Sequence, residues 1–168
     1  MTSKNNLSTV AVVMGSDSDL PVMKSCIDQL TEFGLEPLVR IISAHRTPDI
    51  AAEFADSAAK KGIKVIIAAA GMAAHLAGAL AARTALPIIG VPLAASGAPA
   101  GIDALLSTVQ MPPGVPVATV AIGKPGAKNA AVLAVQILAL NDKDLEQKLA
   151  DFRKAQSAKV IEKDAALD

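Results

Sequence analysis

The feature that most constrains this chain is a regular alternation between short, β-branched apolar runs and segments with helical apolar spacing. Five runs are expected to be strands, and each is followed by apolar residues at three- and four-residue intervals. The expected strands are Thr9–Met14, Pro37–Ile42, Ile63–Ala68, Pro87–Val91 and Val115–Ile122. Strands that alternate with helices predict an α/β fold with a parallel sheet and right-handed crossovers.

Proline and glycine punctuate the segments between the strands. Pro21 and Pro48 can each open a helix at its first position, and Gly34 and Gly62 are suited to end those helices. The remaining expected helices are an alanine-rich segment from His75 to about Arg83, a short helix over Ile102–Val109, and Ala127–Leu140. The last of these is apolar around most of its circumference, which predicts burial on all sides.

The tail of the chain differs in composition. Asp142 can cap a mixed-charge helix that runs to about residue 163 and presents a stripe of Leu145, Leu149 and Phe152. We expect this arm to lie on the surface or across a neighbouring subunit. No repeat or linker marks a second domain, so residues 1–168 are interpreted as one domain with its core at about 9–140.

Composition excludes several classes of protein. The 16 basic and 16 acidic residues cancel, which argues against a nucleic-acid partner or an anionic membrane bound through a basic surface. The single cysteine, Cys26, rules out an intrachain disulfide and a cysteine-based zinc cluster, and its helical context predicts a core position. No long apolar segment follows Met1, so we expect no secretory signal and a cytoplasmic location.

The middle of the chain is unusually poor in charge. Val65–Ala82 carries no formal charge and approaches the length of a membrane span, but Gly71 and His75 favour a buried strand followed by a buried helix. Between Val65 and Asn141 the charged residues are Arg83, Asp103, Lys124 and Lys128. One small domain would have difficulty hiding so uncharged a surface, which predicts a homo-oligomer.

Five alternating strands favour a flavodoxin-like, three-layer domain with strand order 2-1-3-4-5. The crossovers then reverse between the first and third strands, where open α/β sheets bind ligands. Three polar turns would meet at this crevice: Gly15–Asp19, Ser43–Pro48 and Ala70–His75. A small-molecule site is therefore expected between them.

The turn Ser43–Pro48 carries the most chemistry. It contains a hydroxyl, the imidazole of His45, the guanidinium of Arg46 and a second hydroxyl on Thr47. An imidazole can move protons near neutral pH, and a guanidinium can bind a phosphate or carboxylate with two parallel hydrogen bonds. The alternative is that Thr47 caps the helix and the rest is surface.

The turn Gly15–Asp19 lacks the glycine spacing of a dinucleotide fingerprint and the lysine of a P-loop. Ser16 at a helix N-terminus could donate to a phosphate. Asp17 and Asp19 would repel a phosphate, so one of them is expected to accept hydrogen bonds from sugar hydroxyls. The alternative is an ordinary turn in which Ser18 or Asp19 caps the helix.

His75 has two interpretations: a ligand-site residue, or a core or interface histidine in apolar company. With His45 and His75 as the only histidines, a metal site is not expected. Ser43 and Ser96 lack a nucleophile-elbow sequence, so acyl transfer is not indicated. Lys124 and Lys128 flank a glycine turn and could bind an anion or be merely exposed.

Several segments together resemble one family. They are Val13–Asp19, Ser43–Asp49, Val65–Ala68 with Ala73–Leu76, Gly90–Pro92, Ser107–Pro112, and Ala121–Lys124 with Asn129–Ala131. This set resembles the N5-carboxyaminoimidazole ribonucleotide mutases of purine biosynthesis, the class I catalytic subunit of phosphoribosylaminoimidazole carboxylase. Arg46-Thr47-Pro48 resembles the mutase class, whereas the carboxylase class, which uses aminoimidazole ribonucleotide and CO2 directly, typically has Lys-Gly-Pro there. The resemblance spans about residues 10–140.

Two positions depart from the family pattern, which usually reads Gly-Gly-Ala-Ala-His-Leu-Pro-Gly. This chain has Met72 in place of the second glycine and Ala77 in place of the proline. Met72 adds a side chain to a loop expected to approach the ligand, and Ala77 removes a rigid turn. Neither change deletes a chemical group, so the activity implied by the resemblance is retained.

The resemblance implies a role for each site residue. Ser16, Ser43 and Arg46 would hold the 5′-phosphate and nearby polar atoms, and Asp19 would bind the ribose hydroxyls. His45 would carry the proton, and the remaining substrate-binding residues would be Gly71 and His75.

The reaction implied is the conversion of N5-carboxyaminoimidazole ribonucleotide to 4-carboxy-5-aminoimidazole ribonucleotide in de novo IMP biosynthesis. It would proceed by decarboxylation and recarboxylation in a closed, dry chamber, with His45 as general acid and base and with no cofactor or metal. The family assembles as an octamer. Two other hypotheses remain open: a non-catalytic phosphate- or nucleotide-binding module, and a purely structural role for these turns.

Overall fold

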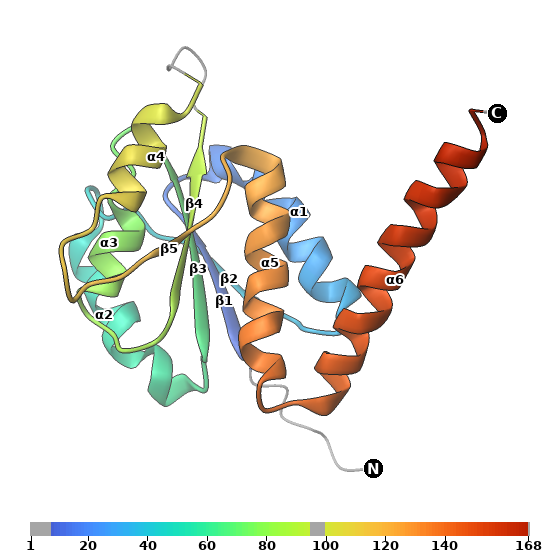
Figure 1. Cartoon of the computed structure of the whole chain (residues 1–168). Helices are drawn as coiled ribbons and strands as arrows, with labels where there is room; N and C mark the ends of the chain where they lie inside the picture. Colours follow the sequence, from blue (N-terminus) through green and yellow to red (C-terminus); the bar gives the residue numbers. More distant parts are fainter. Residues whose placement is uncertain (1–7, 95–99, 168) are drawn as a thin grey trace.

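The computed structural model describes residues 8–94 and 100–167, and it shows one parallel sheet covered by helices on both faces (Figure 1). The strand order β2-β1-β3-β4-β5 confirms the predicted flavodoxin-like order. The strands are β1 (Val10–Met14), β2 (Leu38–Ile41), β3 (Val65–Gly71), β4 (Ile88–Leu93) and β5 (Ala118–Thr119).

The helices are α1 (Leu20–Glu32), α2 (Pro48–Ala58), α3 (Leu76–Ala81), α4 (Ile102–Val109), α5 (Gly123–Ala139) and α6 (Lys143–Ala165), with 3₁₀ turns η1 (Asp17–Asp19) and η2 (Ala59–Lys61). Helices α1 to α4 connect successive strands, as the alternation predicted, and α5 and α6 follow the last strand. Gly62 has φ +88°, a left-handed conformation that suits glycine, and it ends the α2–η2 helix as predicted.

Both faces of the sheet are packed. Along β1, Val10, Val12 and Met14 face a core shared with α1, α5 and the start of α6, while Ala11 and Val13 face a second core shared with α2 and α3. This alternation follows from the two-residue period of a strand. All five β1 residues are buried, as expected for a parallel sheet with helices on both sides.

The fifth strand is shorter than predicted. Pairing with β4 covers Ala118 and Thr119 only, whereas the β-branched pattern predicted Val115–Ile122. Pro116 has no N–H to contribute to a ladder, and β5 is the edge strand. The hydrophobic pattern therefore overestimated the length of this edge strand, because it took no account of the proline.

Helix α5 is not buried on all sides, so that prediction is wrong for the single chain. Ala127, Ala130, Ala131, Ala134 and Val135 are buried against the sheet and α1. The opposite side is partly exposed, because α5 is an outer layer with only α1 and the beginning of α6 beside it (Figure 1).

Helix α6 forms the predicted C-terminal arm. The Asp142 carboxylate caps it, since Oδ1 accepts from the N–H groups of Asp144 at 3.0 Å and Leu145 at 3.1 Å. Leu145 is buried, and Phe152 lies against Phe33 with 5.2 Å between ring centroids. Beyond Phe152 the helix is exposed and extends away from the sheet (Figure 1).

The uncharged segment that resembled a membrane span forms β3 and the short helix α3. Among the described residues, no helix combines the length and the apolar character needed to cross a bilayer. Cys26 lies in the core as predicted, and burial raises the pKa of its thiol to about 12.

Candidate active site

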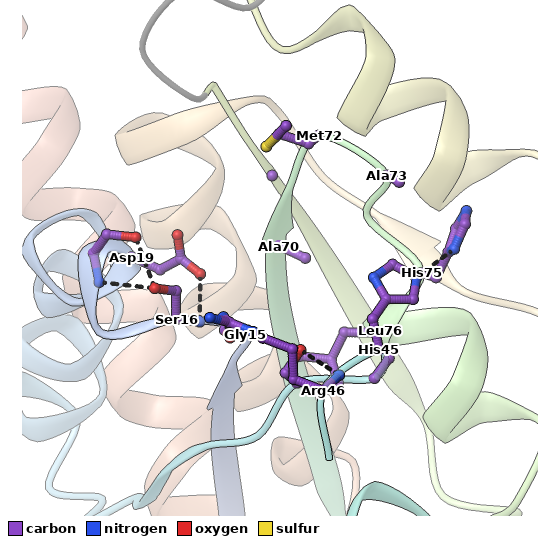
Figure 2. A pocket seen from close by; sticks show the side chains of 14 residues that line it. Gly15, Ser16, Asp19, His45, Arg46, Ala70, Met72, Ala73, His75 and Leu76 are labelled. Carbon is purple, nitrogen blue, oxygen red and sulfur yellow. Dashed lines mark hydrogen bonds between the residues drawn. The ribbon is translucent and has the colours of Figure 1, made fainter. Parts of the chain in front are cut away.

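A cleft lies at the carboxyl ends of β1, β2 and β3, where the strand order reverses. It has a volume of about 510 Å³ and is walled by the three predicted turns (Figure 2). All seven predicted site residues line it: Ser16, Asp19, Ser43, His45, Arg46, Gly71 and His75. The other described lining residues are Gly15, Ser18, Ala44, Ala70, Met72, Ala73 and Leu76.

The first turn is closed by a reciprocal pair of hydrogen bonds. The Ser16 hydroxyl accepts from the Ser18 N–H at 3.3 Å, and the Asp19 carboxylate accepts from the Ser16 N–H at 3.0 Å. Ser16 therefore caps the 3₁₀ turn η1. Asp19 occupies the N-cap position of α1, one of the two positions that the alternative named, but its side chain makes no capping bond to that helix. The Ser16 hydroxyl also donates to Asp17 at 3.0 Å, so a phosphate would compete with this exposed carboxylate for the proton.

Asp19 sits at the inner end of this turn. Burial raises the pKa of its carboxyl group above the usual value, while hydrogen bonds from the backbone and the positive charge of Arg46 oppose that shift. A carboxylate has lone pairs for about four hydrogen bonds. Asp19 can thus hold the Ser16 N–H and still accept hydrogen bonds from hydroxyl groups of a ligand.

The second turn is held by Thr47. Its hydroxyl accepts from the Ser43 N–H at 3.0 Å and donates to the Ser43 carbonyl at 2.9 Å, and the Thr47 N–H also donates to that carbonyl at 2.9 Å. Thr47 occupies the position before α2, but its side chain makes no capping bond. Thr47 is thus the N-cap residue of α2 by position, as that interpretation had it, but its hydroxyl closes the turn instead of capping the helix.

Arg46 links the first two turns. Its Nη2 donates to the Gly15 carbonyl at 3.0 Å, and its backbone N–H donates to the Ser43 hydroxyl at 3.1 Å. The Arg46 side chain is exposed to the cleft, and a guanidinium has five N–H donors. The arrangement leaves donors for an anion beside the hydroxyl of Ser43.

His45 and His75 meet across the cleft, although 29 residues separate them in the chain (Figure 2). His45 Nε2 lies 2.8 Å from His75 Nδ1, and the rings are edge to face with 4.9 Å between centroids. Such a contact requires a proton on one nitrogen and a lone pair on the other. His75 is exposed, so the interpretation of it as a core histidine does not hold.

One departure from the family pattern lies in the third turn and the other lies just after it, in α3. Met72 has φ +56° and a side chain that is 64% exposed at the cleft. Ala77, in contrast, is buried in the first turn of α3. The side chain that adds to the cleft is therefore that of Met72, while Ala77 belongs to the packing.

The expected closed, dry chamber is not formed by one chain. His45, Arg46 and His75 are all exposed, because the described part of the chain supplies three walls and nothing that covers them. The described residues contain no group of three or more acidic, histidine or cysteine side chains that could hold a metal ion. Ser96 lies outside the described residues.

Lys124 and Lys128 lie elsewhere. They line a separate surface hollow of about 370 Å³ beside α1, together with Lys24, Asp28 and Glu32. The two acidic side chains make this hollow mixed in charge. The structure thus separates these lysines from the predicted ligand cleft.

Side-chain contacts are what sequence reasoning missed. The Thr47–Ser43 closure and the His45–His75 contact depend on side-chain conformation, although the four-residue spacing of Ser43 and Thr47 was visible. The apolar lining of Ala44, Ala70 and Leu76 could have been inferred from the same turns.

Comparisons with known proteins identify the family of the chain. The chain is 52% identical over 162 residues to the N5-carboxyaminoimidazole ribonucleotide mutase of Escherichia coli K12, covering 96% of this chain and 95% of that protein. It is 51% identical to the mutase of Pyrococcus horikoshii, covering 98% and 92%. The crystal structure of Treponema denticola PurE superposes with a TM-score of 0.83 at 31% identity, covering 95% of this chain and 98% of that one. The profile of the family described as AIR carboxylase matches residues 9–159, and the chain belongs to that family.

Proposed function

We propose that this protein is an N5-carboxyaminoimidazole ribonucleotide mutase that produces 4-carboxy-5-aminoimidazole ribonucleotide in purine biosynthesis. The observation that carries the proposal is the contact of His45 with His75 beside the Ser43–Arg46 donors, in one cleft of a chain about 50% identical to named mutases. Arg46-Thr47-Pro48 favours the mutase class over a carboxylase that takes CO2 directly.

The cleft offers a place for each part of a ribonucleotide. Arg46, Ser43 and Ser16 would bind the 5′-phosphate, since they bring a guanidinium and two hydroxyls together. Asp19 would accept hydrogen bonds from the ribose hydroxyls. The base would then lie toward His45, with Gly71 and His75 on the other side.

His45 would supply the proton chemistry. In the first step the bond between the exocyclic nitrogen and its carboxylate breaks, CO2 leaves, and His45 gives a proton to the nitrogen. In the second step the ring carbon bonds to CO2 and its proton returns to His45, so atoms and charge balance over the cycle. In the structure, His45 Nε2 lies 2.8 Å from His75 Nδ1. When substrate binds, its exocyclic nitrogen would replace His75 Nδ1 as the hydrogen-bond partner of His45 Nε2. No cofactor or metal is needed by this route.

We also propose a homo-oligomer, for which the resemblance implies an octamer, acting in the cytoplasm. Ile102, Leu106 and Val109 are 49%, 51% and 46% exposed on one side of α4, and Val160 and Ile161 are each 68% exposed on α6. Exposed apolar side chains at helical spacing favour contact with further copies. Such contacts would also help to cover a cleft that one chain leaves open.

A mutase assay on the purified protein tests this function. The wild type is expected to convert the N5-carboxy substrate without ATP or added bicarbonate, at a mass that light scattering on the same sample shows to be oligomeric. His45→Asn removes the acid–base group and is expected to lower kcat at least about 1,000-fold while nucleotide binding persists.

Other results would favour the competing hypotheses. A strict requirement for bicarbonate would indicate the carboxylase class. Tight nucleotide binding by the wild type with no carboxylate transfer would indicate a binding module. If changes at Ser16 or Arg46 altered stability alone, the turns would have a structural role.

A further inference from the structure

Met72 has a backbone conformation that is costly for its residue type. Its φ of +56° lies in the left-handed region, where a Cβ crowds the backbone. Among the described residues, the other non-glycine residue with positive φ is Ala100, and five further positions of this kind are glycines. A glycine would adopt this conformation at Met72 without the steric cost.

The Met72 side chain gains little burial within the chain to offset that cost. It is 64% exposed, the most exposed large apolar side chain among those that line the cleft. Figure 2 shows it at the end of β3, between the Ser16–Asp19 turn and His75. The thioether therefore borders the space where the proposed substrate would lie, and little else in the described chain covers it.

The neighbours of Met72 indicate which part of a ligand it would meet. Polar donors and acceptors for a phosphate and a sugar come from the first two turns, at Ser16, Asp19, Ser43 and Arg46. The third turn offers apolar side chains and His75 instead. Sulfur packs favourably against flat aromatic rings, so a planar heterocycle is the ligand group that suits Met72.

The geometry points to Met72 as a substrate-contacting residue that packs its thioether against the aminoimidazole ring and shields the transferring carboxylate from water. This inference rests on the proposed function, because that function supplies the ring. It makes Met72 a specificity residue for ligands that bear a flat base, and it assigns no proton transfer to Met72.

Binding of two ligands to the purified protein, residues 1–168, tests the contact. Titration calorimetry would compare 5-aminoimidazole ribonucleotide with ribose 5-phosphate, which lacks the ring. Met72→Gly is expected to raise the Kd of the ribonucleotide roughly 2- to 10-fold and to leave that of ribose 5-phosphate unchanged. Met72→Leu, which retains apolar bulk, is expected to bind the ribonucleotide more tightly than Met72→Gly does.

Ala100→Gly is the matched control, since it relieves the same type of conformation at a residue that does not line the cleft. It is expected to change neither Kd. An equal rise in the Kd of both ligands on Met72→Gly would overturn the inference, because the third turn would then have lost order as a whole. A changed oligomer mass in sedimentation would overturn it too, by assigning Met72 to a subunit contact.

These outcomes are separable from failure of the proposed function. An inactive wild type would refute the mutase assignment, yet the two titrations would still decide whether Met72 contacts a ring. An active wild type whose two Kd values are unaffected by Met72→Gly would keep the mutase and refute the contact.

Discussion

The turns after β1 and β2 differ from the turn after β3 in how they are held. In the first two turns, side chains bond to backbone groups. The Asp19 carboxylate accepts from the Ser16 N–H, and the Thr47 hydroxyl accepts from the Ser43 N–H. The Arg46 guanidinium donates to the Gly15 carbonyl and so joins the two turns. In the described structure, the third turn has one side-chain hydrogen bond, between His75 and His45, and it contains Met72 at positive φ.

This difference matches the parts of the ligand that each turn would serve. A phosphate and a ribose need donors and acceptors at fixed positions, and groups held in advance bind them with less loss of conformational entropy. A flat base needs an apolar surface, which tolerates more movement. The first two turns therefore hold their polar groups through side-chain hydrogen bonds, and the third turn has fewer such bonds.

The largest expected effect comes from breaking the link between the first two turns. Arg46→Met removes the charge and the bond to Gly15, and it is expected to raise the Kd of ribose 5-phosphate about 100-fold. Titration calorimetry measures the Kd of ribose 5-phosphate for the variant and the wild type. Arg83→Met is the control, since Arg83 pairs with Asp56 on the surface away from the cleft and should leave that Kd unchanged. An equal effect of both variants would show that general charge, not the placement of Arg46, governs binding.

A smaller effect is expected from loosening one turn. Thr47→Val keeps the side-chain shape but removes both hydroxyl bonds to Ser43, so the His45 turn should lose its fixed form. We expect about a 10-fold loss of kcat/KM and a fall in Tm of about 2–4 °C. Ser57→Ala removes a partly exposed hydroxyl that bonds to α2 carbonyls, and it should change neither quantity appreciably. If kcat/KM of Thr47→Val stayed at the wild-type value, the turn would not need this closure.

The smallest expected effect concerns pH and the first turn. Burial raises the pKa of Asp19 in the folded chain above its unfolded value, so the folded state binds more protons between the two values and loses stability as pH rises through that interval. The Asp19→Asn variant has no carboxyl group at this position, so it does not show this loss of stability with rising pH. The Tm of the variant minus that of the wild type should therefore increase from pH 3.5 to pH 7, by no more than about 2 °C because Asp19 is only partly buried. A decrease in that difference would show that hydrogen bonds outweigh desolvation at Asp19.

The sheet order could be predicted because five strands that alternate with helices favour it. The seven proposed site residues came from the family resemblance, and the strand order places the turns that carry them around one cleft. What could not be predicted depends on individual side chains. The direction of the Thr47 hydroxyl and the contact of the two imidazoles are set by rotamers rather than by periodicity.

Two errors concerned exposure. The apolar circumference of α5 predicted complete burial, but a hydrophobic pattern does not state whether the sheet or another molecule covers each side. The expected dry chamber is likewise not formed by the single chain, in which His45 and Arg46 lie in an open cleft. In the proposed homo-oligomer, further copies would cover apolar surface that one chain leaves exposed.

The cleft is lined, among the described residues, by positions between Gly15 and Leu76 alone. The later part of the chain contributes β4, β5, α4, α5 and α6, which complete the sheet and its cover. Chemistry and scaffold thus occupy successive stretches of one polypeptide. Substitutions in the second stretch can alter thermal tolerance or subunit association while the reacting groups stay as they are, so the two properties can be selected, or engineered, one at a time.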